Sequence, residues 1–185
     1  NTGQTCSAYS RLLVPLTMKA EVEEKIKTMT EKYPFSKNSQ DKLDIGPLAS
    51  KKQYEKVLGY IKKGQEEGAT LLLGEVPEGD GYYVGPFVFT DVSNDMSIAR
   101  EEIFGPVLSV IYYHNEEEAL EIANDNDYGL SGAVFGDEEK AVQFASKMRT
   151  GGVSINKGNS SHNAPFGGYK KSGYGREGGM YGLEE

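Results

Sequence analysis

The sequence is poor in the residues that build disulfides and metal centres. Its 185 residues include one cysteine, Cys6, two histidines and no tryptophan. A single cysteine cannot form an intramolecular disulfide, which favours a reducing compartment. One cysteine and two histidines also support a zinc site poorly, so we expect no metal.

Long apolar runs are missing too. No run approaches the roughly 18 residues that a membrane-spanning helix needs, and no apolar N-terminal segment resembles a secretion signal. The formal net charge of −8 works against binding to nucleic acid or anionic membranes. We therefore expect a cytoplasmic protein with neither partner. The hydrophobic content of 37% fits one folded domain with a sizeable core.

Amphipathic segments alternate with short apolar runs along the chain. The helices are expected to open at Thr17, Ser50, Asn115 and Asp137, and Ser50 with Gln53 resembles a capping box. The strands are expected at 12–14, 71–73, 107–112, 133–135 and 153–155. Such alternation predicts a three-layer α/β/α sandwich with a mostly parallel sheet, in which ligands sit beyond the carboxyl ends of the strands. Residues 74–86 are expected to form a surface loop or hairpin.

Cys6 is the first candidate for chemistry. Small and polar neighbours leave its sulfur room, and backbone N–H groups there could stabilise a thiolate or an oxyanion. The alternative is that Cys6 is a small buried hydrophobe. His114 and His162 have no spacing that assigns either of them to Cys6 as a base, so surface positions are expected for both.

Two further segments could serve a ligand. In residues 101–107 (EEIFGPV), a carboxylate could accept hydrogen bonds from ribose hydroxyls and a phenyl ring could support a flat heteroaromatic ring. A solvated acidic pair beside a core phenylalanine is the alternative. Residues 165–177 combine glycines with Lys and Arg as a phosphate loop would, but their spacing matches neither known phosphate-binding fingerprint, which favours a structural loop.

Taken together, these segments resemble the aldehyde dehydrogenase superfamily. Six blocks in the same order carry the resemblance: 1–6 (NTGQTC), the middle section from 45 to 89 (IGP, EGA and GPFVF), 101–107, 126–131, 151–156 and 165–177. The match covers nearly the whole chain, and six ordered blocks are specific.

The resemblance implies that Cys6 attacks an aldehyde, that hydride passes to NAD or NADP, and that water hydrolyses the resulting thioester to a carboxylic acid. It implies that Glu102 binds the nicotinamide-side ribose and that Phe104 lies near the nicotinamide ring. Thr5 and Ser7 would line the substrate pocket. In the full-length enzyme, the partners implied are the aldehyde, the chain's own cofactor-binding domain and further copies in a dimer or tetramer.

The resemblance also implies that parts of the enzyme lie elsewhere. The family's cofactor-binding domain, glutamate base and side-chain oxyanion donor precede its cysteine signature, so we expect 1–185 to be a catalytic domain truncated at both ends and inactive alone. Neither Glu101 nor Glu102 is expected to be the base. Two other hypotheses stay open: a non-catalytic scaffold or binding module that kept the fold, and a cofactor-free acyl-transfer enzyme that pairs Cys6 with His162.

Overall fold

The computed structural model describes residues 1–32, 45–78, 80–158 and 163–184. The chain divides into two compact units, Asn1–Asn115 (unit 1) and Glu116–Glu185 (unit 2). No helix in the described parts of the chain is long and apolar enough to span a membrane.

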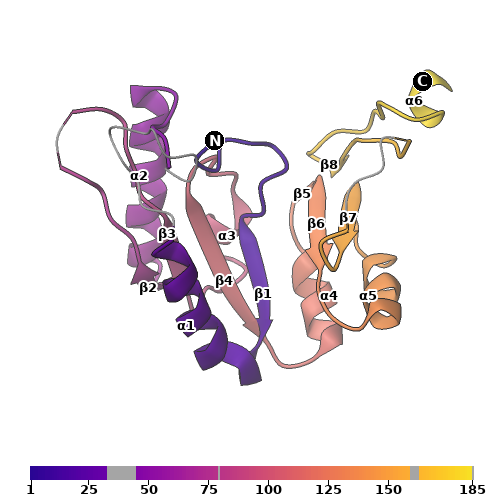
Figure 1. Ribbon diagram of the computed structural model, residues 1–185, viewed down its shortest axis with the longest axis horizontal. Coiled ribbons are helices and arrows are strands. Elements are labelled where there is room, and N and C mark those ends of the chain that lie inside the picture. The colour runs from indigo at the N-terminus through magenta and orange to yellow at the C-terminus, as the bar shows by residue number, and fades with distance from the viewer. Residues whose placement is uncertain (33–44, 79, 159–162, 185) are drawn as a thin grey trace. The chain divides into compact units, whose positions relative to one another are not determined.

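A four-stranded, mostly parallel sheet forms the centre of unit 1. Its strands lie in the order β1 (Arg11–Pro15), β4 (Val107–Tyr113), β3 (Phe87–Thr90) and β2 (Thr70–Leu73). β4 runs parallel to β1, as Figure 1 shows. It also runs parallel to β3, whereas β2 pairs antiparallel with β3. The α/β class and the mostly parallel sheet are therefore confirmed. β3 was not expected as a strand, although all four of its residues are buried.

One face of this sheet packs against α1 (Lys19–Thr30). Val14, Val88 and Val110, from three neighbouring strands, form a buried cluster on this face. Val22 and Ile26 of α1 pack against that cluster. Each side chain is followed on its strand by one that points to the opposite face, as strand geometry requires.

The opposite face packs against α2 (Lys51–Glu66) and α3 (Ser97–Arg100). A Cβ on Gly64 of α2 would lie 3.0 Å from the Ile98 side chain and 3.5 Å from the Phe89 ring, so these elements are in close contact. The buried hydroxyl of Ser109 on β4 donates to the Ile98 carbonyl at 3.0 Å. Helices thus cover both faces, which explains why β3 and β4 read as continuous apolar runs.

Two of the expected helix caps are present. The Ser50 hydroxyl accepts the Gln53 backbone N–H at 3.2 Å, and the Asp137 carboxylate accepts the Lys140 N–H at 3.2 Å. The expected cap at Thr17 is wrong. Thr17 lies within a 3₁₀ turn, η1 (Leu16–Met18), because the chain enters this turn directly from β1, and α1 begins only afterwards, without a side-chain cap.

Unit 2 contains, in its described residues, two small sheets and three helices. β6 pairs parallel with β7, and β5 pairs antiparallel with β8. The elements are α4 (Glu116–Asn124), β5 (Tyr128–Gly129), β6 (Ser131–Val134), α5 (Glu138–Ala145), β7 (Gly152–Ile155), β8 (Tyr169–Lys170) and α6 (Tyr181–Glu184). The glycine-rich stretch 167–182, which the structure describes throughout, contains no helix except the first residues of α6.

Candidate active site

Two of the expected site segments, the loop that carries Cys6 and residues 101–106, meet at the amino edge of the unit 1 sheet. Cys6 lies just before β1, and the 101–106 segment lies just before β4. β1 and β4 are parallel neighbours, with Arg11 opposite Ser109, so both segments approach the same edge. The general rule for open α/β sheets favours the carboxyl edge. In this chain the candidate residues instead lie on segments that lead into the strands.

The loop that carries Cys6 is anchored by its polar side chains. The Thr2 hydroxyl donates to the Gly46 carbonyl at 2.8 Å. The Gln4 side-chain oxygen accepts the Ala49 N–H at 2.8 Å. Residues 1–4 are therefore fixed to the segment that leads into α2.

A backbone contact joins the same loop to the 101–106 segment. Gly3 has a φ of +70°, and a Cβ there would lie only 2.0 Å from the Gly105 carbonyl oxygen. Gly105 in turn packs on α2, since a Cβ on it would lie 2.5 Å from the Val57 side chain. Close packing of two glycines thus brings the cysteine loop and the Glu102–Phe104 segment together.

The Cys6 side chain is exposed and its thiol is free. Among the described residues, no group accepts a hydrogen bond from the Cys6 backbone N–H, although the neighbouring turn closes by an Ala8 N–H to Thr5 carbonyl bond of 3.0 Å. Thr5 is half-buried and Ser7 is exposed. The expectation of a buried, inert cysteine does not fit this environment.

Polar side chains of helix α2 bind the 101–106 segment. The Tyr60 hydroxyl donates to the Glu101 carboxylate at 2.7 Å, and the Lys63 ammonium lies 3.9 Å from the same carboxylate. Lys56 donates to the Glu102 backbone carbonyl at 2.7 Å. Glu101 is therefore a partner of α2. The Glu102 side chain, by contrast, is exposed and makes no hydrogen bond or ion pair with any described residue.

Phe104 adopts an unusual backbone conformation. Its φ is +59°, in the left-handed region that bulky residues rarely occupy. The Phe104 ring is half-buried and borders an open hollow of about 530 Å³. The hollow is lined by Asn1, Thr2, Gln4, Gly46, Pro47, Ala49 and Phe104. Strained backbone of this kind clusters at functional sites.

Gln53 is a site residue that sequence reasoning missed. The capping-box pattern suggested that its side chain would bond back to the N-cap. Instead, its amide nitrogen donates to the carbonyls of Ile103 and Phe104, both at 2.9 Å. No sequence signal could have revealed this, because the partners lie 50 and 51 residues away.

His114 does not join Cys6 in the described structure. His114 follows β4, at the carboxyl edge of the sheet, and is exposed. The seven residues of β4, at roughly 3.3 Å each, place the two edges roughly 20 Å apart. His162 lies outside the described residues.

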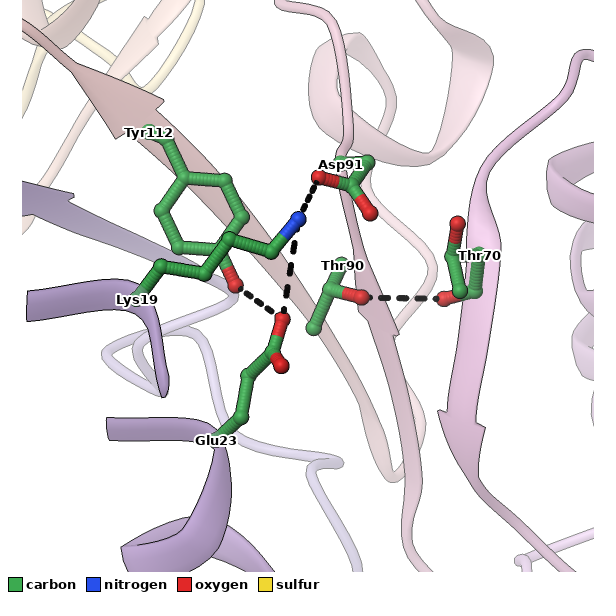
Figure 2. A network of polar contacts seen from close by, with 6 residues as sticks. All are labelled: Lys19, Glu23, Thr70, Thr90, Asp91 and Tyr112. Carbon is green, nitrogen blue, oxygen red and sulfur yellow. Dashed lines mark hydrogen bonds and ion pairs between the residues drawn. The ribbon is translucent and has the colours of Figure 1, made fainter. Parts of the chain in front are cut away.

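The carboxyl edge is occupied by a polar network rather than a site (Figure 2). The Tyr112 hydroxyl donates to the Glu23 carboxylate at 2.7 Å, and Lys19 pairs with both Glu23 and Asp91. The Lys19 ammonium also lies 4.8 Å from the centre of the Tyr112 ring. Partial burial, together with the Glu23 carboxylate, raises the pKa of Tyr112 above its ordinary value. These groups satisfy one another's charges and hydrogen bonds, and they link α1 to the sheet.

Two of the three basic residues of the 165–177 loop donate to backbone carbonyls of unit 2, and the third, Lys171, pairs with the Asp127 carboxylate. One Arg176 nitrogen donates to the Gly168 and Gly175 carbonyls, both at 2.8 Å. Lys170 donates to the Asn124 carbonyl at 2.6 Å and to the Asn126 carbonyl at 2.8 Å. These bonds support the expected structural role of the loop over phosphate binding.

Comparison with known proteins agrees with this arrangement. The family model described as the aldehyde dehydrogenase family matches residues 1–185. A Staphylococcus haemolyticus protein assigned as an aldehyde dehydrogenase is 46% identical over the whole chain, which spans 40% of that protein's length.

Solved structures show the same relationship. The Mycobacterium tuberculosis aldehyde dehydrogenase complexed with NAD⁺ is 45% identical, with a TM-score of 0.94, over 99% of this chain and 39% of that one. A Pseudomonas syringae aldehyde dehydrogenase, a cysteine-to-alanine variant with NAD⁺ and octanal, gives 41% identity and a TM-score of 0.93 over 99% and 39% of the two chains. With a family model matching every residue, the chain belongs to the aldehyde dehydrogenase family.

Proposed function

We propose that this chain is the cysteine-bearing catalytic part of an NAD(P)-dependent aldehyde dehydrogenase that oxidises an aldehyde to a carboxylic acid. The observation that carries the proposal is the placement of the exposed Cys6 thiol on a loop packed, through Gly3, against the Glu102–Phe104 segment. The family membership and the NAD⁺ complexes of similar proteins support it.

The reaction begins at Cys6 in this proposal. The thiolate sulfur adds to the aldehyde carbon and gives a thiohemiacetal whose oxygen carries negative charge. The Cys6 backbone N–H is available to stabilise that oxygen, because no described residue accepts it. Loss of hydride from the former carbonyl carbon leaves a thioester on Cys6. Water then displaces the sulfur, releases the acid and restores the thiol.

Glu102 and Phe104 are assigned to the nicotinamide end of the cofactor. NAD(P)⁺ supplies the hydride acceptor when bound. The Glu102 carboxylate fits a ribose because it is exposed and has no described partner, whereas Glu101 is engaged by Tyr60 and Lys63. The half-buried Phe104 ring can support a flat aromatic ring. Thr5 and Ser7, which flank Cys6, are assigned to the aldehyde pocket.

The chain is proposed to act only together with further sequence. It spans about 40% of the length of the curated relatives it matches. We assign most of the cofactor site, the general base for thioester hydrolysis and the oligomer contacts to that further sequence. With an aldehyde and excess NAD⁺, the 185-residue chain is expected to form no more NADH than its Cys6→Ala variant. Robust NADH production that depends on Cys6 would refute this part.

The nucleophile is tested by acyl transfer from p-nitrophenyl acetate. Intact-mass and peptide mass spectrometry of the 185-residue chain should place one acetyl group on Cys6. This acetyl group should persist, because the base for its hydrolysis is assigned to further sequence. Cys6→Ala should show only slow, scattered lysine acetylation. Scattered acetylation in the unchanged chain, with Cys6 unmodified, would contradict the proposal.

The cofactor-free alternative is separated by a second substitution. If Cys6 works with His162 as a hydrolase, His162→Ala should abolish ester turnover. If Cys6 belongs to a dehydrogenase, Cys6 of the His162→Ala variant should be acetylated as fast as Cys6 of the unchanged chain. The scaffold alternative predicts that Cys6 reacts no faster than a free thiol in a peptide.

A further inference from the structure

We infer that Gln53 is a positioning residue that holds the Phe104 backbone in its left-handed conformation and thereby sets the cofactor-facing surface of Glu102 and Phe104. The inference rests on the proposed function, because that function assigns these two residues to the nicotinamide end of the cofactor.

The direction of the Gln53 side chain is the first observation. Gln53 lies at the third position of α2, where its backbone N–H is already satisfied by Ser50. A glutamine at this position commonly turns back to cap its own helix. Here both amide hydrogens leave the helix and go to two consecutive carbonyls, those of Ile103 and Phe104. The amide can donate two hydrogen bonds, and both are used.

The geometry of the acceptors is the second observation. Carbonyls of consecutive residues point in opposite directions along an extended strand, so one amide cannot reach both. The left-handed φ of +59° at Phe104 provides the turn at which both reach the same nitrogen, at 2.9 Å each. The two bonds therefore oppose relaxation of Phe104 to an extended conformation, which most side chains prefer.

The turn at Phe104 lies between Glu102 and the contact with the cysteine loop, so the Gln53 hydrogen bonds affect both. Glu102 precedes the two carbonyls, and Gly105, which follows them, carries the backbone contact with Gly3 of the cysteine loop. Lys56 fixes only the Glu102 carbonyl, one residue upstream. Apart from the Gln53 amide, no described side chain bonds to the backbone between Ile103 and Gly105.

The experiment compares Gln53→Met with Gln65→Met in the 185-residue chain. Methionine preserves side-chain length and helix propensity but donates no hydrogen bond. Gln65 is an exposed glutamine on the same helix and serves as the matched control. Oxidised nicotinamide mononucleotide is the probe, titrated by NMR, because it carries the nicotinamide and its ribose without the adenosine end. Glu102→Gln serves as the reference for loss of the ribose contact.

We expect Gln53→Met to weaken binding of the probe about tenfold, or ~1.4 kcal/mol, as Glu102→Gln does, while Gln65→Met leaves it unchanged. Hydrogen exchange should also accelerate at residues 102–106 in Gln53→Met alone. Unchanged exchange, or unchanged affinity, in Gln53→Met would overturn the inference and leave the proposed function standing. If Glu102→Gln binds the probe as well as the unchanged chain, or the unchanged chain binds none, the cofactor assignment itself fails and the inference with it.

Discussion

Replacing Gly3 by alanine should break the contact that joins the cysteine loop to the 101–106 segment. A Cβ at Gly3 would lie 2.0 Å from the Gly105 carbonyl oxygen and 2.4 Å from its carbon. Both are backbone atoms, so neither can rotate away. One of the two segments must move.

The magnitude follows from two separate costs. The φ of +70° at Gly3 is left-handed, which costs an alanine about 1–2 kcal/mol. Forcing a methyl group into a packed contact costs about 1–3 kcal/mol more. The sum of about 2–5 kcal/mol is a large share of the roughly 5–15 kcal/mol that typically stabilises a domain. We expect the loop to detach locally rather than unit 1 to unfold, because the strain ends when residues 1–4 move.

Hydrogen exchange with peptide-level mass spectrometry measures this prediction directly. Gly3→Ala should accelerate exchange at residues 1–8 and 101–106, with unit 2 peptides as the internal reference. Gly59→Ala is the matched control, because Gly59 is exposed within α2 and a Cβ there would meet no atom within 4 Å. This control should gain about 0.5–1 kcal/mol from the helix preference of alanine. Exchange in Gly3→Ala indistinguishable from that of the unchanged chain would show that Gly3 does not pack closely against Gly105.

Three further changes test the fold away from this contact. Ser50→Ala removes the α2 cap and should cost about 1 kcal/mol in urea unfolding, with Ser50→Gly costing only a few tenths. Tyr112→Phe removes the hydrogen bond to Glu23 and should cost about 1 kcal/mol at pH 7. Because the pKa of Tyr112 is raised in the folded state, its contribution is present below its ordinary value of 10.0 and is lost as the pH rises beyond it. The free energy of unfolding, measured from pH 8 to 11, should thus fall less steeply for Tyr112→Phe, and an unaltered slope would contradict this. Gly151→Ala, whose Cβ would lie 1.6 Å from the Gly167 carbonyl oxygen, should accelerate hydrogen exchange in unit 2 only.

Local rules predicted much of the secondary structure. Ser50 and Asp137 cap helices where their sequence neighbours indicate, because an N-cap bond spans only three residues. Thr17 fits the same local rule but caps no helix, since the chain passes directly from β1 into a 3₁₀ turn that contains Thr17. Strand β3 went unrecognised because a four-residue apolar run has no periodicity of its own, and pairing with β2 and β4 defines it.

Ordered motifs and local propensities were enough to predict the family, the alternation of helices and strands, and Cys6 as the candidate nucleophile, because each of these depends on residues that are near one another along the chain. Although the resemblance had already assigned the ribose to Glu102, only the tertiary structure showed that Glu101 is engaged by another group, since the Tyr60 hydroxyl reaches it across 41 residues of sequence. The same holds for the choice of the amino edge of the sheet and for the Gln53 amide that holds the turn at Phe104. These features depend on contacts between distant segments, and such contacts exist only once the backbone has folded.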